Sequence, residues 1–219
     1  MHVATKAALV GSTLLAAFAV LVAVRPAAAP QAAQSPSGGP PLTAQQRTGT
    51  LSFSGVNSQD QQVIVDAIHS ARPEAQRLID MVDGAVTVSV MDAGASAAGW
   101  TQADQNGYQV NIDLAKVSSQ LGPRGVQRTV LHEFGHVVDF ALVPPDLKAR
   151  LDAEIPQGYS PCEAGQRDAA CAARAERFAE TFSKWATGDI GASLDIGYRV
   201  PPPSVSLEEW GGPLAQLQG

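Results

Sequence analysis

Three residues in the middle of the chain have the types and the spacing of a metal-dependent hydrolytic site. His132 and His136 are four residues apart, so on a helix both imidazoles lie on one side and can reach a single ion. Glu133 lies beside the first histidine, and its carboxylate is free to take a proton from a metal-bound water. The pattern predicts two zinc ligands and a general base, and zinc needs at least one more protein ligand.

The residues around this motif predict the helix that it needs. An apolar arc recurs at the helical period, made of Val130, Leu131, Phe134, Val137, Val138, Ala141 and Leu142. Gly122-Pro123 begins this helix, since proline suits a first turn, and Pro144-Pro145 ends it. Asp139 shares the polar arc with the two histidines. Because it lies one turn beyond His136, we expect it to hydrogen-bond an imidazole rather than to coordinate the ion.

The third ligand is predicted on a later helix. Apolar residues form a stripe from residue 175 to 185, and Glu176 and Glu180 lie together at one flank of it. No histidine follows His136, which excludes the three-histidine metzincin pattern. We therefore expect Glu176 to bind the ion and Glu180 to accept a hydrogen bond from the outer nitrogen of a ligand histidine. The alternative is a solvated pair of acidic side chains.

These two helices resemble the gluzincins, zinc peptidases that combine His-Glu-x-x-His with a glutamate on a later helix. They are similar to the protease domain of anthrax lethal factor and its relatives over residues 132–139 and 176–182. The resemblance implies a zincin-like fold and one zinc ion. It implies as ligands His132, His136 and Glu176, with Glu133 as the general base.

The resemblance also implies a tyrosine, shortly before the glutamate ligand, that stabilises the oxyanion of the reaction. Tyr159 is the nearest tyrosine upstream of Glu176, and Tyr198 is its rival. A histidine cannot take this role in the manner of thermolysin, because none follows His136. We therefore expect Tyr159 to stabilise the oxyanion, with Tyr198 as the alternative.

The residues ahead of the motif predict a small sheet and an interrupted helix. Alternating residues and a turn at 104–107 predict strands at 51–53 and 86–91 and a hairpin between 100–101 and 108–112. A helical period runs from about residue 59 to 82, with a break at Pro73. His69 falls in this stretch, where a lone histidine is usually a packed or surface residue.

The expected fold class is therefore α+β, a zincin-like domain that is mostly helical, with a small, partly antiparallel sheet before the motif helix. An exposed edge of this sheet could hold an extended peptide by strand addition. The alternative is that the hairpin only covers the core, and the sequence leaves both open.

The N-terminal residues predict export. Residues 7–24 carry no charge between Lys6 and Arg25, which is the layout of a secretory signal. The same run just reaches the length that spans a bilayer, so residues 1–29 are a signal peptide or an uncleaved membrane anchor. Residues 30–47 are rich in Pro, Ala, Gln and Ser and predict a linker. We expect the catalytic domain to comprise residues 48–219.

The two cysteines and the charge balance agree with an exported protein. Cys162 and Cys171 are the only cysteines, and in an exported chain we expect them to form a disulfide, metal ligation being the alternative. The formal net charge is −6, and the folded part lacks basic clusters. An acidic domain of this kind argues against nucleic acid or anionic lipid as a partner. Contact with a membrane is expected only through an N-terminal anchor.

The sequence therefore predicts a zinc metallopeptidase that is secreted or tethered to the outer face of the cytoplasmic membrane, with a peptide or protein as its substrate. Two alternatives stay open. One is a zinc-retaining, non-catalytic binding module of the envelope, and the other is an amidase that acts on cell-wall peptide. Glu133 favours an enzyme, because a structural zinc site has no use for a base.

Overall fold

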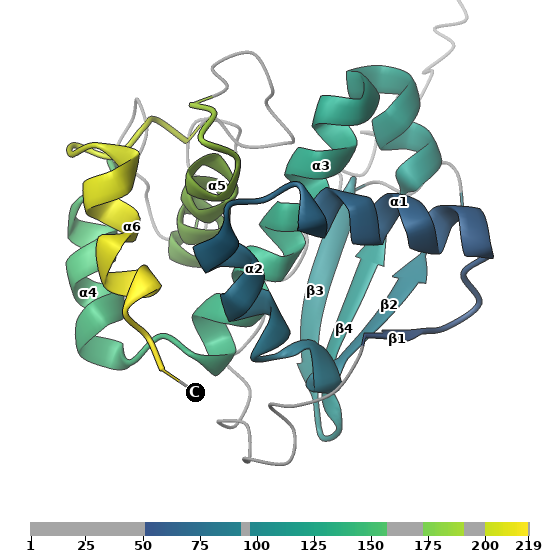
Figure 1. Cartoon of the computed structure of the whole chain (residues 1–219), viewed down its shortest axis with the longest axis horizontal. Helices are drawn as coiled ribbons and strands as arrows, with labels where there is room; N and C mark the ends of the chain where they lie inside the picture. The colour runs from purple at the N-terminus through teal and green to yellow at the C-terminus, as the bar shows by residue number, and fades with distance from the viewer. Residues whose placement is uncertain (1–50, 93–96, 157–172, 191–199, 219) are drawn as a thin grey trace, which may run out of the picture.

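The computed structural model describes residues 51–92, 97–156, 173–190 and 200–218, and these residues form an α+β fold. Their helices are α1 (Ser58–His69), α2 (Pro73–Asp80), α3 (Leu114–Ala141), α4 (Pro145–Ala153), α5 (Arg174–Thr187) and α6 (Leu207–Ala215). Their strands are β1 (Ser52–Phe53), β2 (Val86–Val90), β3 (Gly99–Asp104) and β4 (Gly107–Ile112). Figure 1 shows the sheet on one side and α4, α5 and α6 grouped on the other, with α2 and α3 between them.

The strands form one mixed sheet in the order β1-β2-β4-β3. β1, β2 and β4 run parallel, and β3 pairs antiparallel with β4. The hairpin closes where Asp104 pairs with Gly107, and the Asp104 carboxylate accepts a hydrogen bond from the amide of Asn106 at 2.6 Å. This confirms the predicted hairpin and makes β3 an edge strand that contacts α3.

The first helical stretch has the predicted interruption. Asn57 caps α1 by accepting a hydrogen bond from the amide of Asp60 at 2.9 Å. α1 ends at His69, and Pro73 opens α2, where a proline costs no hydrogen bond. Both helices bury an apolar side, with Ile64, Leu78 and Ile79 almost fully covered. The predicted elements are therefore present here, with boundaries within a few residues.

The motif helix begins and ends as predicted, but a further helical segment precedes it. Pro123 starts the segment that carries the motif, directly after Gly122, whose φ of 66° and ψ of −166° interrupt the helix. The earlier segment of α3 starts at Leu114 and is capped by the Asp113 side chain, which accepts from the amide of Lys116. It buries few side chains, so it produces no clear period in the sequence.

α6 is also absent from the sequence-based expectations. Its run Gly211–Pro213 is typical of a loop, which hides the helix. Ser206 caps it, and the buried indole of Trp210 donates to the Leu151 carbonyl at 3.2 Å. The packing of Trp210 in the core thus overrides the low helix propensity of the two glycines.

Several predictions lie outside the described residues and stay predictions. They are the signal or anchor at 1–29, the linker at 30–47, the Cys162–Cys171 disulfide, and the oxyanion candidates Tyr159 and Tyr198. Within the ranges that the structure describes, no helix combines the length and the apolar character needed to cross a membrane.

The packing of α6 on α5 gives a matched pair of stability predictions. A Cβ at Gly211 would lie 2.0 Å from Nε1 of the buried Trp185, whereas a Cβ at the adjacent Gly212 would meet no atom within 4 Å. We expect Gly211→Ala to lower the free energy of unfolding by about 1–3 kcal/mol through overpacking. Gly212→Ala should leave it unchanged or raise it slightly. Urea denaturation measures both, and equal stabilities would contradict this packing.

Candidate metal centre

The three predicted metal ligands meet where α3 and α5 pack together. His132 and His136 project from α3 and Glu176 from the first turn of α5, and all three are buried. Glu176 Oε2 lies 3.1 Å from His132 Nε2 and 3.5 Å from His136 Nε2. A tetrahedral ion with bonds of about 2.1 Å holds its ligand atoms about 3.4 Å apart. This buried group could therefore hold a metal ion.

Gly135 allows α5 to come close enough to complete this group. A Cβ at Gly135 would lie 3.0 Å from the Cα of Ala179 and 3.2 Å from its carbonyl oxygen. Both distances are shorter than ordinary van der Waals contacts, so any side chain here would push the helices apart. The small residues at these two positions therefore set the helix separation on which the distance from Glu176 to the histidines depends.

Glu180 faces the outer side of His132. Its Oε2 lies 3.4 Å from His132 Nδ1, whereas the other ring nitrogen faces Glu176. A hydrogen on Nδ1 that points to this carboxylate leaves the lone pair of Nε2 free for a metal ion. The structure thus brings Glu180 and His132 together in the arrangement that the sequence predicts.

Arg128, which the sequence analysis did not single out, holds Glu180 in place. It lies one turn before His132 on α3, and its side chain is 1% exposed. Its Nη2 donates to Glu180 Oε1, and its Nε donates to Ser183 Oγ at 2.8 Å. Lys184 Nζ lies 3.5 Å from the same Glu180 oxygen. The four-residue spacing from Arg128 to His132 is the sequence signal that could have found it.

The carboxylates around His132 favour the charged form of its imidazole. Burial alone would lower the pKa of His132, but the hydrogen bonds to Glu176 and Glu180 and the negative charges around the ring raise it to about 10. Burial tends to raise the pKa of Glu176, and the two imidazoles outweigh it and lower this pKa. The carboxylates therefore favour a cation at this position, either a proton on His132 or a metal ion in its place.

The Glu133 carboxylate contacts the edge strand β3. Its Oε2 accepts a hydrogen bond from the buried Thr101 hydroxyl at 2.7 Å. Burial raises the pKa of Glu133, and the two imidazoles and Thr101 oppose part of this rise. A raised pKa makes a carboxylate a stronger base. Thr101 could not be identified from the sequence, because a hairpin pattern does not tell which of its residues meets the motif helix.

Asp139 makes no hydrogen bond to either imidazole within the described residues, so the predicted hydrogen bond is wrong. Its carboxylate is fully buried and receives two hydrogen bonds from Arg174, at the start of α5. Within the described residues, Nδ1 of His136 has no hydrogen-bond partner. The His136 ring is instead stacked on Phe140, with ring centroids 6.0 Å apart. The helical wheel places Asp139 on the same side of α3 as the two histidines. Its carboxylate is instead bound by Arg174, and this ion pair attaches α5 to α3.

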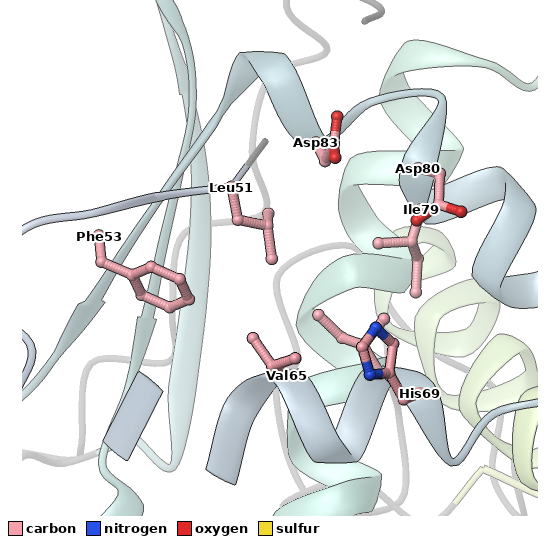
Figure 2. A pocket seen from close by; sticks show the side chains of 8 residues that line it. Leu51, Phe53, Val65, His69, Ile79, Asp80 and Asp83 are labelled. Atoms are coloured by element: carbon pink, nitrogen blue, oxygen red, sulfur yellow. The ribbon is translucent and has the colours of Figure 1, made fainter. Parts of the chain in front are cut away.

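His69 lies in a separate pocket, far along the chain from the metal group. Figure 2 shows it with Val65 of α1, Ile79 and Asp80 of α2, and Phe53 of β1. No residue that lines this pocket belongs to α3 or α5. His69 is exposed at the end of α1, as expected for a surface histidine, and it is not part of the metal group.

No protein-family model, no curated protein and no solved structure matches this chain. The gluzincin resemblance therefore remains a prediction that rests on residues of α3 and α5. The α+β fold and the buried group of His132, His136 and Glu176 stand on the structure itself.

The geometry distinguishes the two glutamates of α5 by their effect on metal content. Glu176→Ala removes an oxygen that faces both histidines, so we expect nearly complete loss of bound metal. Glu180→Ala removes only the partner of His132 Nδ1, so affinity should fall by about 10–100-fold. Elemental analysis after dialysis and a chelator titration measure both values. Glu208, whose side chain is 72% exposed, supplies the control Glu208→Ala. Equal metal loss in the two variants of α5 would contradict the assignment.

The buried pair of Arg128 and Glu180 gives a prediction for stability. Arg128→Met leaves the Glu180 carboxylate buried without its closest cation, so the free energy of unfolding should fall by about 3–5 kcal/mol. The double variant Arg128→Met/Glu180→Met removes the Glu180 carboxylate together with its arginine, so it should recover most of the lost free energy of unfolding. Urea denaturation measures both variants. A double variant that is no more stable than the single one would show that the charges are not coupled.

Proposed function

We propose that this protein is an exported, zinc-dependent metallopeptidase that hydrolyses peptide bonds. The observation that carries the proposal is the convergence of the Glu176 carboxylate oxygen on two imidazole nitrogens, at 3.1 and 3.5 Å. A second carboxylate, that of Glu133, is buried next to His132 in the sequence and is not one of the three candidate ligands. Two histidines and one acidic residue form a ligand set of catalytic zinc sites, which keep a fourth position open. Imidazole and carboxylate together fit zinc better than calcium or magnesium, which prefer oxygen alone.

A zinc ion in this group would polarise the scissile carbonyl and lower the pKa of a water molecule. Glu133 then takes a proton from the attacking water and delivers it to the leaving nitrogen. One water is consumed, the carbon–nitrogen bond breaks, and a carboxylic acid and an amine are formed. His132 and His136 must be neutral to act as ligands. In the neutral ring of His132, Glu180 favours the tautomer that carries its hydrogen on Nδ1 and leaves Nε2 free for the ion.

Glu133 also separates the proposal from a non-catalytic zinc module. It is 4% exposed, and burying a carboxylate away from water carries a cost in free energy. A site that only stores zinc would gain nothing from it, because its oxygen faces Thr101 rather than the three ligands. A buried carboxylate that is adjacent to a candidate ligand but is not itself one therefore favours a catalytic site over a structural one.

The variant Glu133→Gln tests this proposal. Glutamine has nearly the same size and still accepts a hydrogen bond, but it is not a base. We expect zinc content to be unchanged and the kcat for peptide cleavage to fall by about 100–10,000-fold. Cleavage is measured by mass spectrometry on a peptide library, with and without a chelator. Unchanged cleavage by the variant, or no chelator-sensitive cleavage by the native protein, would overturn the proposal.

A further inference from the structure

The side chain of Glu133 is held from outside its own helix, by the edge strand β3. The Thr101 hydroxyl lies 2.7 Å from Glu133 Oε2 and 3.1 Å from the Glu133 carbonyl oxygen. Both side chains are buried, each 4% exposed. A hydroxyl has one hydrogen, and the shorter distance favours its donation to the carboxylate, where charge strengthens the bond.

Gly99 contacts the same carboxylate from a second position on β3. A Cβ at Gly99 would lie 2.4 Å from Glu133 Oε1, 2.9 Å from its Cδ and 3.0 Å from its Cγ. The backbone at Gly99 has an ordinary strand conformation and no positive φ, so the chain path itself does not require glycine there. Glycine is required at this position because the Glu133 side chain occupies the space that a Cβ would fill.

Gly99 and Thr101 act together because they lie on the same face of β3. Residues two apart on a strand point the same way, and both of these meet α3 at one residue. Pairing with β4 fixes this strand: Gly99 pairs with Ile112 and Thr101 with Val110, and both partners are fully buried. The Thr101 hydroxyl therefore fixes Oε2 of Glu133 by a hydrogen bond, and the absence of a side chain at Gly99 leaves room for Oε1.

We propose that Thr101 and Gly99 are positioning residues for the general base, and that β3 rather than α3 alone sets the direction of the Glu133 carboxylate. This inference rests on the proposed function, since it assigns a role within the same reaction. The Thr101 hydroxyl and the space at Gly99 both face Glu133, which is not one of the candidate metal ligands, so the positioning is separate from metal binding. Proton transfer depends steeply on geometry, and a displacement of about 1 Å can cost about 100-fold in rate.

The kinetic test compares Thr101→Val, Thr101→Ser and Gly99→Ala with the native protein on one peptide substrate. Valine keeps the shape and removes the donor, serine keeps the donor, and alanine pushes the carboxylate from its place. We expect kcat to fall about 10–100-fold in Thr101→Val and Gly99→Ala, with KM within about twofold and zinc content unchanged. Thr101→Ser should restore most of kcat.

Two substitutions of the same chemistry serve as controls. Thr87→Val changes a threonine of β2 that alternates with the buried Val86 and Val88, and Gly212→Ala adds a Cβ that meets nothing. Both should keep the native kcat. The proposal is overturned if Thr101→Val and Gly99→Ala keep kcat as well, if they lose zinc in proportion to kcat, or if Thr101→Ser is as slow as Thr101→Val.

A second measurement needs no activity. A double-mutant cycle of Thr101→Val and Glu133→Met, followed by urea denaturation, isolates the coupling between the hydroxyl and the carboxylate. We expect a coupling of about 10–100-fold in the unfolding equilibrium constant, because the bond involves a charged acceptor. Additive effects would overturn the proposal. If the native protein shows no metal-dependent cleavage, the proposed function fails, and this cycle still decides whether Thr101 holds Glu133.

Discussion

The contact between α3 and α5 places buried charges of both signs together, and the rest of the structure depends on their balance. Glu176 and Glu180 are 5% and 3% exposed, and two such carboxylates one turn apart on a helix repel each other. α3 supplies the opposite charge from Arg128 and, through its raised pKa, from His132. Without either helix, the buried charges of the other would have no partner of opposite sign. The site and the helix packing are therefore one feature.

Such an arrangement is costly for stability and useful for binding a cation. Buried ion pairs rarely stabilise a fold more than apolar residues of the same size would. Here the charges fix positions: Arg128 holds Glu180, Glu180 faces one nitrogen of His132, and Glu176 faces the other. His132 is thus held by neighbours that are themselves held, as a preorganised metal site requires of its ligands. The sheet adds the last group, since β3 contacts Glu133.

The sequence predicted the parts of this site that follow from spacing along one helix. The two histidines, and the two glutamates of α5, are each four residues apart, and helical geometry alone brings such pairs together. The break at Pro73 and the hairpin at Asp104–Gly107 follow in the same way from local chain preferences. These features require no knowledge of how the elements pack.

What the sequence could not predict depends on packing between distant elements. Thr101 and Glu133 are 32 residues apart in the chain, and no local sequence pattern indicates that they are in contact. Asp139 was assigned to an imidazole because the helical wheel shows its direction but not the arrival of Arg174 from α5. α6 was missed because Trp210 packs well enough to hold a helix that contains two glycines and a proline.

In the function that we propose, one zinc ion is bound by two imidazole nitrogens and one carboxylate oxygen. Zinc X-ray absorption spectroscopy of the purified protein would identify these ligands, because the metal–ligand distances distinguish nitrogen and oxygen from sulfur. We expect only nitrogen and oxygen neighbours at about 2.0–2.2 Å, with the multiple-scattering pattern of two imidazoles, and part of this pattern should disappear in His136→Ala. Sulfur at about 2.3 Å, which would place Cys162 or Cys171 on the metal, or a spectrum without imidazole, would contradict it.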